Sequence, residues 1–208
     1  MSAAVRSFPS VARTLPAKVS ARLAGDPSPG SMLAECFDSP IGPLLGAVTP
    51  DGVCLLEFVD RRALPTELDD LTRILEVPVA DASQAPSGPQ HAHLASLRAQ
   101  LNDYFAGRLR SFTLALHTPG TPFEREVWAE LQRIPYGQTC SYGDVANRIN
   151  RPGAQRAVGR ANGRNRIAIV IPCHRVIESN GKLRGYGGGL PRKQFLLDLE
   201  RGQPQLVH

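Results

Sequence analysis

The chain has 208 residues, which is enough to bury a full core as one large domain or two smaller ones. No apolar run approaches the length needed to span a bilayer, so we expect a soluble protein rather than a membrane protein. The four cysteines form neither a C-x-x-C pair nor a Cys/His spacing typical of zinc sites, which favours free thiols in a reducing compartment.

The formal net charge of +5 is unevenly distributed along the chain. The balance of basic over acidic residues is +3 for residues 1–30, −5 for residues 31–116 and +7 for residues 117–208. The basic final segment suggests that this part faces a polyanion, although a solvated basic surface would have the same composition.

Residues 1–30 are rich in Ser, Ala, Pro and Arg and contain no acidic residue before Asp26. This composition predicts a disordered leader. Scattered basic residues among apolar ones also resemble an organelle-targeting peptide, but an apolar secretory segment is missing. We favour an untargeted tail, or an overlong start, over import, and we expect residues 203–208 to form a loose tail.

The segment from residue 31 to residue 117 alternates short apolar runs with turn residues, which is typical of a strand meander. The strands are predicted over residues 32–37, 44–48 and 53–59, in antiparallel order, with a further strand over 112–116. Helices are predicted over residues 65–75 and 90–105, with a polar loop over 77–89 between them. This half contains no group of residues with the pattern of a catalytic or metal-binding site, so its predicted role is that of a scaffold.

The second half begins with Thr121-Pro122, an N-cap followed by a proline at the first helical position. An apolar stripe then predicts a helix up to Ile134. Ser141 caps a short second helix, and a turn at residues 151–153 leads into a third helix over residues 154–161. Two helices joined by a short turn that contains glycine form the outline of a helix-turn-helix motif.

The third of these helices carries Arg156 and Arg160, which share one face because they are four residues apart. Small residues such as Ala157 and Val158 would allow the helix to approach a duplex closely and to neutralise phosphates. A solvated arginine face looks the same in a sequence, so these residues alone favour the two interpretations about equally.

An apolar run over residues 167–171 predicts a strand that delivers Cys173 beside His174, where the burial pattern stops. This is the layout of a nucleophile at the end of a strand. A free cysteine is more often a small buried side chain, and the six residues around Cys173 taken alone favour that interpretation. Glu200, in a final helix over residues 191–201, is a candidate partner for the histidine.

The final helix follows a glycine-rich loop over residues 185–189, which could approach a ligand closely or be an ordinary surface loop. Helical spacing directs Phe195, Leu196 and Leu199 inward, and Arg192 and Lys193 outward.

The motif Pro172-Cys173-His174-Arg175-Val176 resembles that of the O6-alkylguanine-DNA alkyltransferases, the methylated-DNA–protein-cysteine methyltransferase family. The resemblance runs from about Phe37 to Glu200, and its supporting motifs are Ser141-Tyr142-Gly143, Arg156-Ala157-Val158-Gly159, Asn165, Tyr186 with the glycines after it, and Glu200. It implies an α/β N-terminal domain over residues 31–117, ribonuclease H-like with an antiparallel sheet and helices. It also implies a mainly α C-terminal domain with a helix-turn-helix over residues 118–202.

The resemblance implies DNA repair by direct reversal of damage, in which an alkyl group moves from guanine O6, or from thymine O4, to the sulfur of Cys173. His174 is then the base that takes the thiol proton, and Glu200 orients its imidazole. Asn165 is expected to bond within the turn that holds the thiol, and the hydroxyl of Tyr142 to donate to the base. The thioether product is stable, so each molecule acts once and needs no cofactor.

The resemblance also assigns a substrate pocket and a DNA-binding surface. The pocket residues are Pro172, Val176, Tyr186, Gly187, Gly188 and Lys193, with carbonyls of Cys173 and Val176 accepting from the exocyclic amine. The DNA-binding residues are Ser141, Arg156, Ala157, Gly159 and Arg160, with Arg156 entering the base stack. The expected partner is alkylated double-stranded DNA, bound through the minor groove with little sequence specificity. The protein is expected to be a monomer that is cytoplasmic and associated with the nucleoid.

Some positions depart from the family pattern. Cys54 and His117 fall near the zinc ligands of some relatives, but Gly30 and Thr49 stand where two cysteines would be, so we predict no metal site. Ala168 stands where some relatives have proline, and its smaller side chain could admit bulkier alkyl groups.

The residues alone are compatible with other functions. A lesion binder that does not transfer the alkyl group would lack the reactive cysteine, whereas Cys173 is present. A DNA-binding regulator with an inert cysteine would bind specific sequences. A thiol hydrolase would turn over repeatedly, and it leaves the arginine-rich helix unexplained. The chain could also be a fragment of a larger adaptive-response protein, although the leader lacks the cysteines of a sensor domain.

Overall fold

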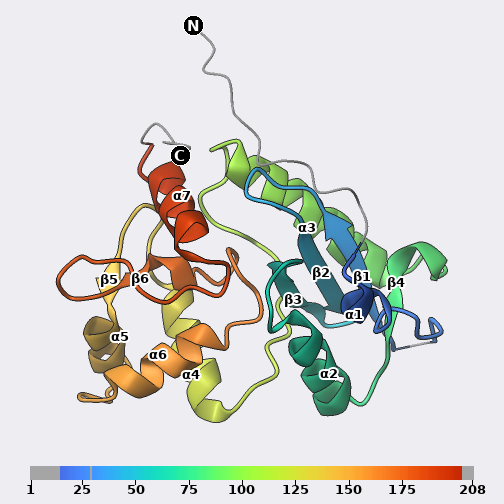
Figure 1. Cartoon of the computed structure of the whole chain (residues 1–208), viewed down its shortest axis with the longest axis horizontal. Coiled ribbons are helices and arrows are strands. Elements are labelled where there is room, and N and C mark those ends of the chain that lie inside the picture. Colours follow the sequence, from blue (N-terminus) through green and yellow to red (C-terminus); the bar gives the residue numbers. More distant parts are fainter. Residues whose placement is uncertain (1–14, 29, 203–208) are drawn as a thin grey trace, which may run out of the picture.

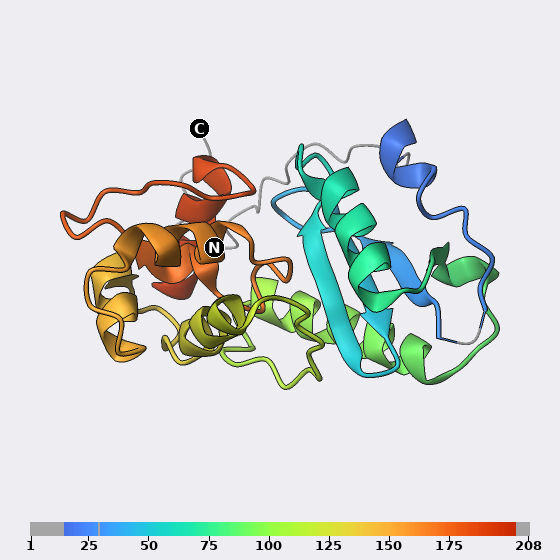
Figure 2. The ribbon, with the colours of Figure 1, turned by 90° about the horizontal axis from the view of Figure 1, so that it is seen from below.

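Three consecutive strands form the centre of the N-terminal lobe in the computed structural model, which describes residues 15–28 and 30–202. They are β1 (Met32–Phe37), β2 (Leu44–Thr49) and β3 (Gly52–Phe58), each antiparallel to the next, as predicted. Every residue of β2 and β3 is buried, because helices cover both faces of the sheet. Figures 1 and 2 show this lobe beside a second, mainly helical one.

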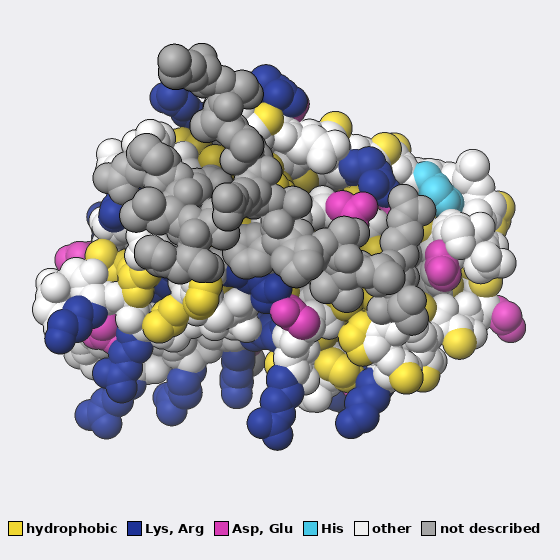
Figure 3. Space-filling model, turned by 45° about the horizontal axis from the view of Figure 1, so that its top comes forward, with side chains coloured by type: hydrophobic (Ala, Val, Ile, Leu, Met, Phe, Trp, Pro, Cys, Tyr) yellow, Lys and Arg dark blue, Asp and Glu magenta, His cyan; other side chains and the backbone are white. Residues whose placement is uncertain are grey.

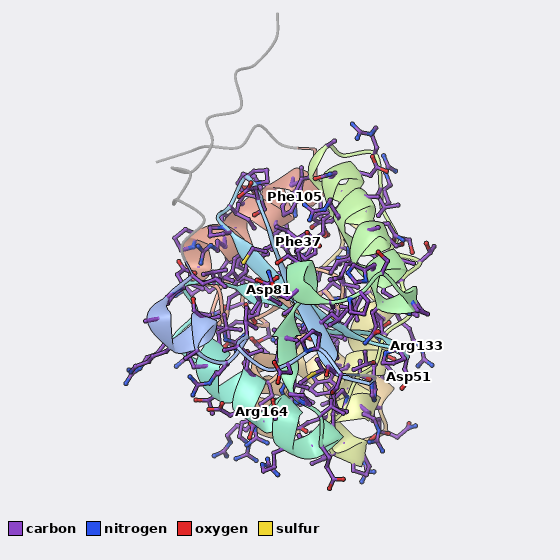
Figure 4. All side chains as sticks on the ribbon, turned by 90° about the vertical axis from the view of Figure 1, so that its right-hand side faces the viewer. Phe37, Asp51, Asp81, Phe105, Arg133 and Arg164 are labelled. Atoms are coloured by element: carbon purple, nitrogen blue, oxygen red, sulfur yellow. The ribbon has the colours of Figure 1, made fainter. Side chains whose placement is uncertain are left out.

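A fourth strand, β4 (Val79–Asp81), pairs in parallel with β1 and gives the order β3-β2-β1-β4. The predicted polar loop over residues 77–89 was therefore wrong here, and the sheet is mixed rather than purely antiparallel. A strand of three residues is too short to show a recognisable alternation of apolar and polar residues in the sequence. Asp81, labelled in Figure 4, accepts a hydrogen bond from the Ser83 amide and starts the 3₁₀ turn η1 (Ala82–Gln84).

Helices α2 (Leu64–Leu75) and α3 (Pro89–Phe105) lie on opposite faces of the sheet. A short helix, α1 (Ala17–Ser20), packs with α2, and its Val19 is buried. The predicted disordered leader was therefore wrong for residues 15–28, because their apolar side chains complete this layer of the core. Residues 1–14 and 203–208, the rest of the predicted leader and tail, lie outside the described residues.

The outer edge of β3 is shared by two later segments of the chain. Residue Val53 exchanges backbone hydrogen bonds with residues 115 and 117, and Leu56 exchanges them with residues 166 and 168. The predicted strand over residues 112–116 was wrong, because its pairing with β3 is limited to one bridge at Leu116. This edge joins the sheet directly to the segment that precedes Cys173.

The C-terminal lobe contains four helices among the described residues: α4 (Pro122–Gln132), α5 (Tyr142–Arg148), α6 (Gln155–Gly163) and α7 (Leu190–Glu200). A short parallel pair joins β5 (Cys140–Ser141) to β6 (Val176–Ile177). Thr121 and Ser141 form capping boxes at α4 and α5, so both predicted caps were right. Helices α5 and α6 pack together as the predicted helix-turn-helix.

Replacing Thr121 with alanine is expected to lower the free energy of unfolding by about 1 kcal/mol, because the Thr121 hydroxyl accepts from the Glu124 amide at the start of α4. Urea unfolding would measure the change. Thr66→Ala, an exposed threonine in the first turn of α2, is the matched control and should change stability much less. Equal effects of the two substitutions would contradict the cap assignment.

Candidate active site

Cys173 follows a tight turn, and the strand predicted over residues 167–171 was wrong. The Ile171 amide donates to the Ile167 carbonyl, and the Val170 amide donates to the Ala168 carbonyl. The turn needs a left-handed residue, which is Ile169 with φ of 71°. A β-branched residue rarely adopts this conformation, so packing of the buried side chain must hold it there.

Asn165 fastens this turn from inside. Its side-chain nitrogen donates to the Ile171 carbonyl at 2.8 Å, and its oxygen accepts from the Ile167 amide at 3.0 Å. The chain then enters the 3₁₀ turn η2 (Cys173–Arg175). The nucleophile candidate is thus held by side-chain bonds as well as by the edge of β3.

The Cys173 thiol is buried, and burial raises its pKa to about 11 despite a hydrogen bond with Asn165 that acts in the opposite direction. The resting side chain is therefore a neutral thiol at pH 7. A thiol in this state is a poor nucleophile until a base removes its proton.

The His174 ring, on the residue after Cys173, and the Glu200 carboxylate face each other with no exposure of either side chain. The His174 Nε2 atom lies 2.9 Å from Glu200 Oε1. Burial lowers the pKa of His174, and Arg175 and Lys193 lower it further against the opposing effect of the Glu200 carboxylate, so the ring is neutral at pH 7. This arrangement fits an imidazole that donates from Nε2 and keeps Nδ1 free to accept a proton.

The Glu200 carboxylate is held by groups from both lobes. Arg175 donates to it at 2.8 and 2.9 Å, the Tyr104 hydroxyl at 2.8 Å and the Gly137 amide at 3.1 Å. Burial alone would raise the pKa of Glu200, but the hydrogen bonds from His174 and Arg175 outweigh it and hold that pKa well below its usual value. The buried charge is therefore fully compensated.

The His174 Nδ1 atom is buried and has no hydrogen-bond partner among the described residues. A buried ring nitrogen without a partner is costly unless it has a use or a water molecule. On the residue next to the thiol, this atom is the available proton acceptor.

A cavity of about 210 Å³ opens onto Cys173. Of the predicted pocket residues, Tyr186, Gly187 and Gly188 line it, together with Tyr142, Gly159, Asn165 and Ala168. A Cβ atom on Gly188 would collide with the ring of Phe58, so only glycine allows this loop to lie against the sheet.

A second, more open hollow of about 600 Å³ lies over α5 and α6 and shares Tyr142 and Gly159 with the first cavity. Ser141 and Arg156 line it as well. Arg160 is exposed on α6, whereas Ala157 is half-buried. Figure 3 shows Lys and Arg side chains in a row along the lower edge of the molecule, the edge on which α5, α6, α4 and α2 lie in Figure 1.

The structure does not bring Pro172, Val176 and Lys193 into the lining of the Cys173 cavity. The outward orientation predicted for Lys193 was wrong, because its side chain is completely buried. The Nζ atom donates to the carbonyls of Val176 at 2.7 Å and Arg184 at 3.0 Å. Lys193 therefore holds the base of the loop over residues 178–189 rather than facing solvent or the cavity.

Sequence reasoning missed several residues at this site. Tyr104 was given no role in the sequence analysis, yet its hydroxyl donates to the Glu200 carboxylate. Arg175 was assigned no role of its own, although its position directly after His174 could have indicated a second partner for Glu200. Glu57 and Arg61 line the Cys173 cavity from the N-terminal lobe, and no local pattern distinguishes them from ordinary surface charges.

The described residues contain no group of three or more His, Cys, Asp or Glu side chains that could hold a metal ion. Of the residues weighed above for a zinc site, Thr49 Oγ1 lies 2.9 Å from His117 Nδ1, and Cys54 is buried. In the same part of the chain, no helix is both long and apolar enough to cross a membrane.

Comparison with known proteins agrees with this geometry. Two domain models of 6-O-methylguanine DNA methyltransferase match, the ribonuclease-like domain over residues 32–118 and the DNA binding domain over residues 122–202. A methylated-DNA–protein-cysteine methyltransferase of Mycobacterium leprae is 45% identical over 167 residues, covering 80% of this chain and 91% of the relative. One of Methanosarcina acetivorans is 43% identical over 169 residues, covering 81% and 98%.

Among solved structures, Mycobacterium tuberculosis OGT in complex with DNA matches with a TM-score of 0.67 and 41% identity, covering 82% of this chain and 93% of that one. The predicted two-domain architecture and the resemblance drawn from the cysteine motif agree with these matches. The chain belongs to the 6-O-methylguanine DNA methyltransferase family.

Proposed function

We propose that this protein repairs DNA by transferring a methyl or larger alkyl group from guanine O6, or from thymine O4, to the sulfur of Cys173. The observation that carries the proposal is the buried thiol at the end of a cavity, beside a neutral histidine that is paired with a buried carboxylate. The names of the relatives support the same reaction. The acceptor is consumed, so each molecule acts once, without a cofactor.

The reaction begins with loss of the thiol proton. His174 accepts that proton at Nδ1, directly or through a water molecule, while Glu200 stabilises the imidazolium through Nε2. The thiolate then attacks the alkyl carbon, the new S–C bond forms, and the C–O6 bond breaks with its electron pair moving to guanine. The departing guanine takes up one proton, which balances the proton that sulfur gives to His174.

The leaving base needs a proton donor, and Tyr142 is suited to this role. Its side chain lines the cavity, and burial raises its pKa, so the hydroxyl carries its proton at neutral pH. In the resting state this hydroxyl lies 3.4 Å from the Arg184 carbonyl, a weak bond that a base could replace. Backbone amides of the loop at Tyr186, Gly187 and Gly188 are the candidate donors to O6.

The alkyl carbon of a paired base lies inside the duplex, so the nucleotide must be turned out into the cavity. We propose that α6 enters the minor groove, where Arg156 fills the gap and Arg160 contacts phosphates. The hollow that leads from Arg156 to the Cys173 cavity supports this route. Binding of this kind should depend little on the sequence that flanks the lesion. We further propose that the protein is a monomer and that it acts on the nucleoid in the cytoplasm.

The decisive experiment is incubation with a duplex that carries one O6-methylguanine, followed by mass spectrometry of intact protein and peptides. We expect one added methyl group on the Cys173 peptide, saturating at about one per molecule because the thioether is stable. Undamaged duplex and Cys173→Ala are the controls. Tight DNA binding without modification of Cys173 would leave only a damaged-DNA binder.

Replacing His174 with glutamine is expected to slow the single-turnover transfer by about 10²–10⁴-fold, because the proton acceptor is lost. DNA affinity should change little, since the ring is buried behind the thiol. The transfer rate is measured with excess protein by quenching the reaction at set times, and DNA affinity is measured by fluorescence anisotropy. A His174→Gln variant that is folded and transfers at the normal rate would remove His174 from the mechanism.

Replacing Arg160 with alanine should weaken binding to any duplex to a similar extent and reduce the slope of log affinity against log salt by about 1. Arg73→Ala, an exposed arginine on α2, is the matched control and should leave both quantities unchanged. If Arg73→Ala has the larger effect, the DNA surface lies elsewhere.

A further inference from the structure

The wall of the Cys173 cavity includes two charged side chains from the N-terminal lobe. They are Glu57, near the end of β3, and Arg61, just after it. Their side chains are only 1% and 12% exposed, and they form an ion pair with each other. Charged residues are almost never fully buried unless they are paired, and here the two charges are paired with each other on the wall of the cavity.

Arg61 also contacts three other parts of the molecule. It pairs with Glu67 of α2 at 3.0 Å and donates to the carbonyl of Gly163, the last residue of α6, at 3.0 Å. A Cβ atom on Gly187 would collide with its guanidinium, so the glycine loop lies directly against Arg61. One side chain therefore connects the sheet, the DNA-binding helix and the loop that lines the cavity.

We propose that Glu57 and Arg61 are positioning residues for the transfer reaction, which hold the cavity wall and set the electrostatic potential at the acceptor sulfur. This inference rests on the proposed function of Cys173. It gives the N-terminal lobe a direct part in the chemistry, beyond its role as a scaffold.

The two charges act on the thiol in opposite directions. Ionised Glu57 raises the pKa of Cys173, and Arg61 lowers it, in addition to the larger effects of burial and Asn165. Burial raises the pKa of Glu57 itself to about 7, with Arg61 opposing the rise and Glu67 adding to it. The titratable or charged groups that face Cys173 are Glu57, Arg61, Tyr142, His174, Tyr186 and Lys193.

Because the thiol titrates well above pH 7, Glu57 is ionised where the thiolate forms. Glu57→Gln removes a negative charge, so it should lower the pKa of Cys173 by about one unit. Arg61→Gln leaves the carboxylate of Glu57 without its partner, so it should raise the pKa of Cys173 by a similar amount. Both substitutions break the same ion pair, and a purely structural role would shift the pKa in one common direction.

The test measures the rate at which iodoacetamide alkylates Cys173 as a function of pH, without DNA, by mass spectrometry of the Cys173 peptide. Peptide-level detection separates this thiol from exposed Cys36. Single-turnover transfer from O6-methylguanine is measured on the same variants, and Glu57→Gln should be faster than Arg61→Gln by about tenfold or more. Glu35→Gln and Arg98→Gln, which break a solvent-exposed pair, are the matched controls and should behave as the unmodified protein.

Opposite shifts of the thiol pKa, with normal thermal unfolding, support the proposal. Shifts in the same direction, or none, would overturn it. If the unmodified protein fails to transfer a methyl group at all, the proposed function falls, whereas the thiol titration still decides whether these two charges act on Cys173.

Discussion

The buried Glu200 carboxylate is the interaction on which the site depends. An ionised carboxylate in the protein interior is stable only when several donors surround it, and here they come from distant parts of the chain. Tyr104 belongs to the N-terminal lobe, whereas His174 and Arg175 follow the reactive cysteine. A chain that satisfies this one charge has therefore already aligned its two lobes and fixed the orientation of the histidine ring.

The second constraint is the edge of β3, where backbone hydrogen bonds join Leu56 to residues 166 and 168. These bonds and the side chain of Asn165 hold a turn that contains a left-handed isoleucine at position 169. Strained backbone of this kind persists only where the surroundings determine it. The sheet is thus the support that allows a sharply bent segment to present a cysteine at the end of a cavity.

Local sequence signals predicted much of the fold. They include the turns of the meander, the threonine and proline that begin α4, and the serine that caps α5. The outline of the helix-turn-helix was predicted as well, whereas the residues around Cys173 pointed to a nucleophile only through the resemblance to a known family. Features that depend on distant partners were not. The three-residue strand β4 and the buried orientation of Lys193 follow from tertiary contacts, which no periodicity records. Glu57 approaches Cys173 only because the two lobes share the edge of β3.

The deep burial of Cys173 bears on how long the protein stays usable in a cell. Because burial raises the pKa of this thiol to about 11, almost all of it is protonated at neutral pH. Small electrophiles in solution react with thiolates, so they find very little to attack. A protein that can react only once is thereby protected from being spent on random reagents, and its reactivity is reserved for a group that fits the cavity.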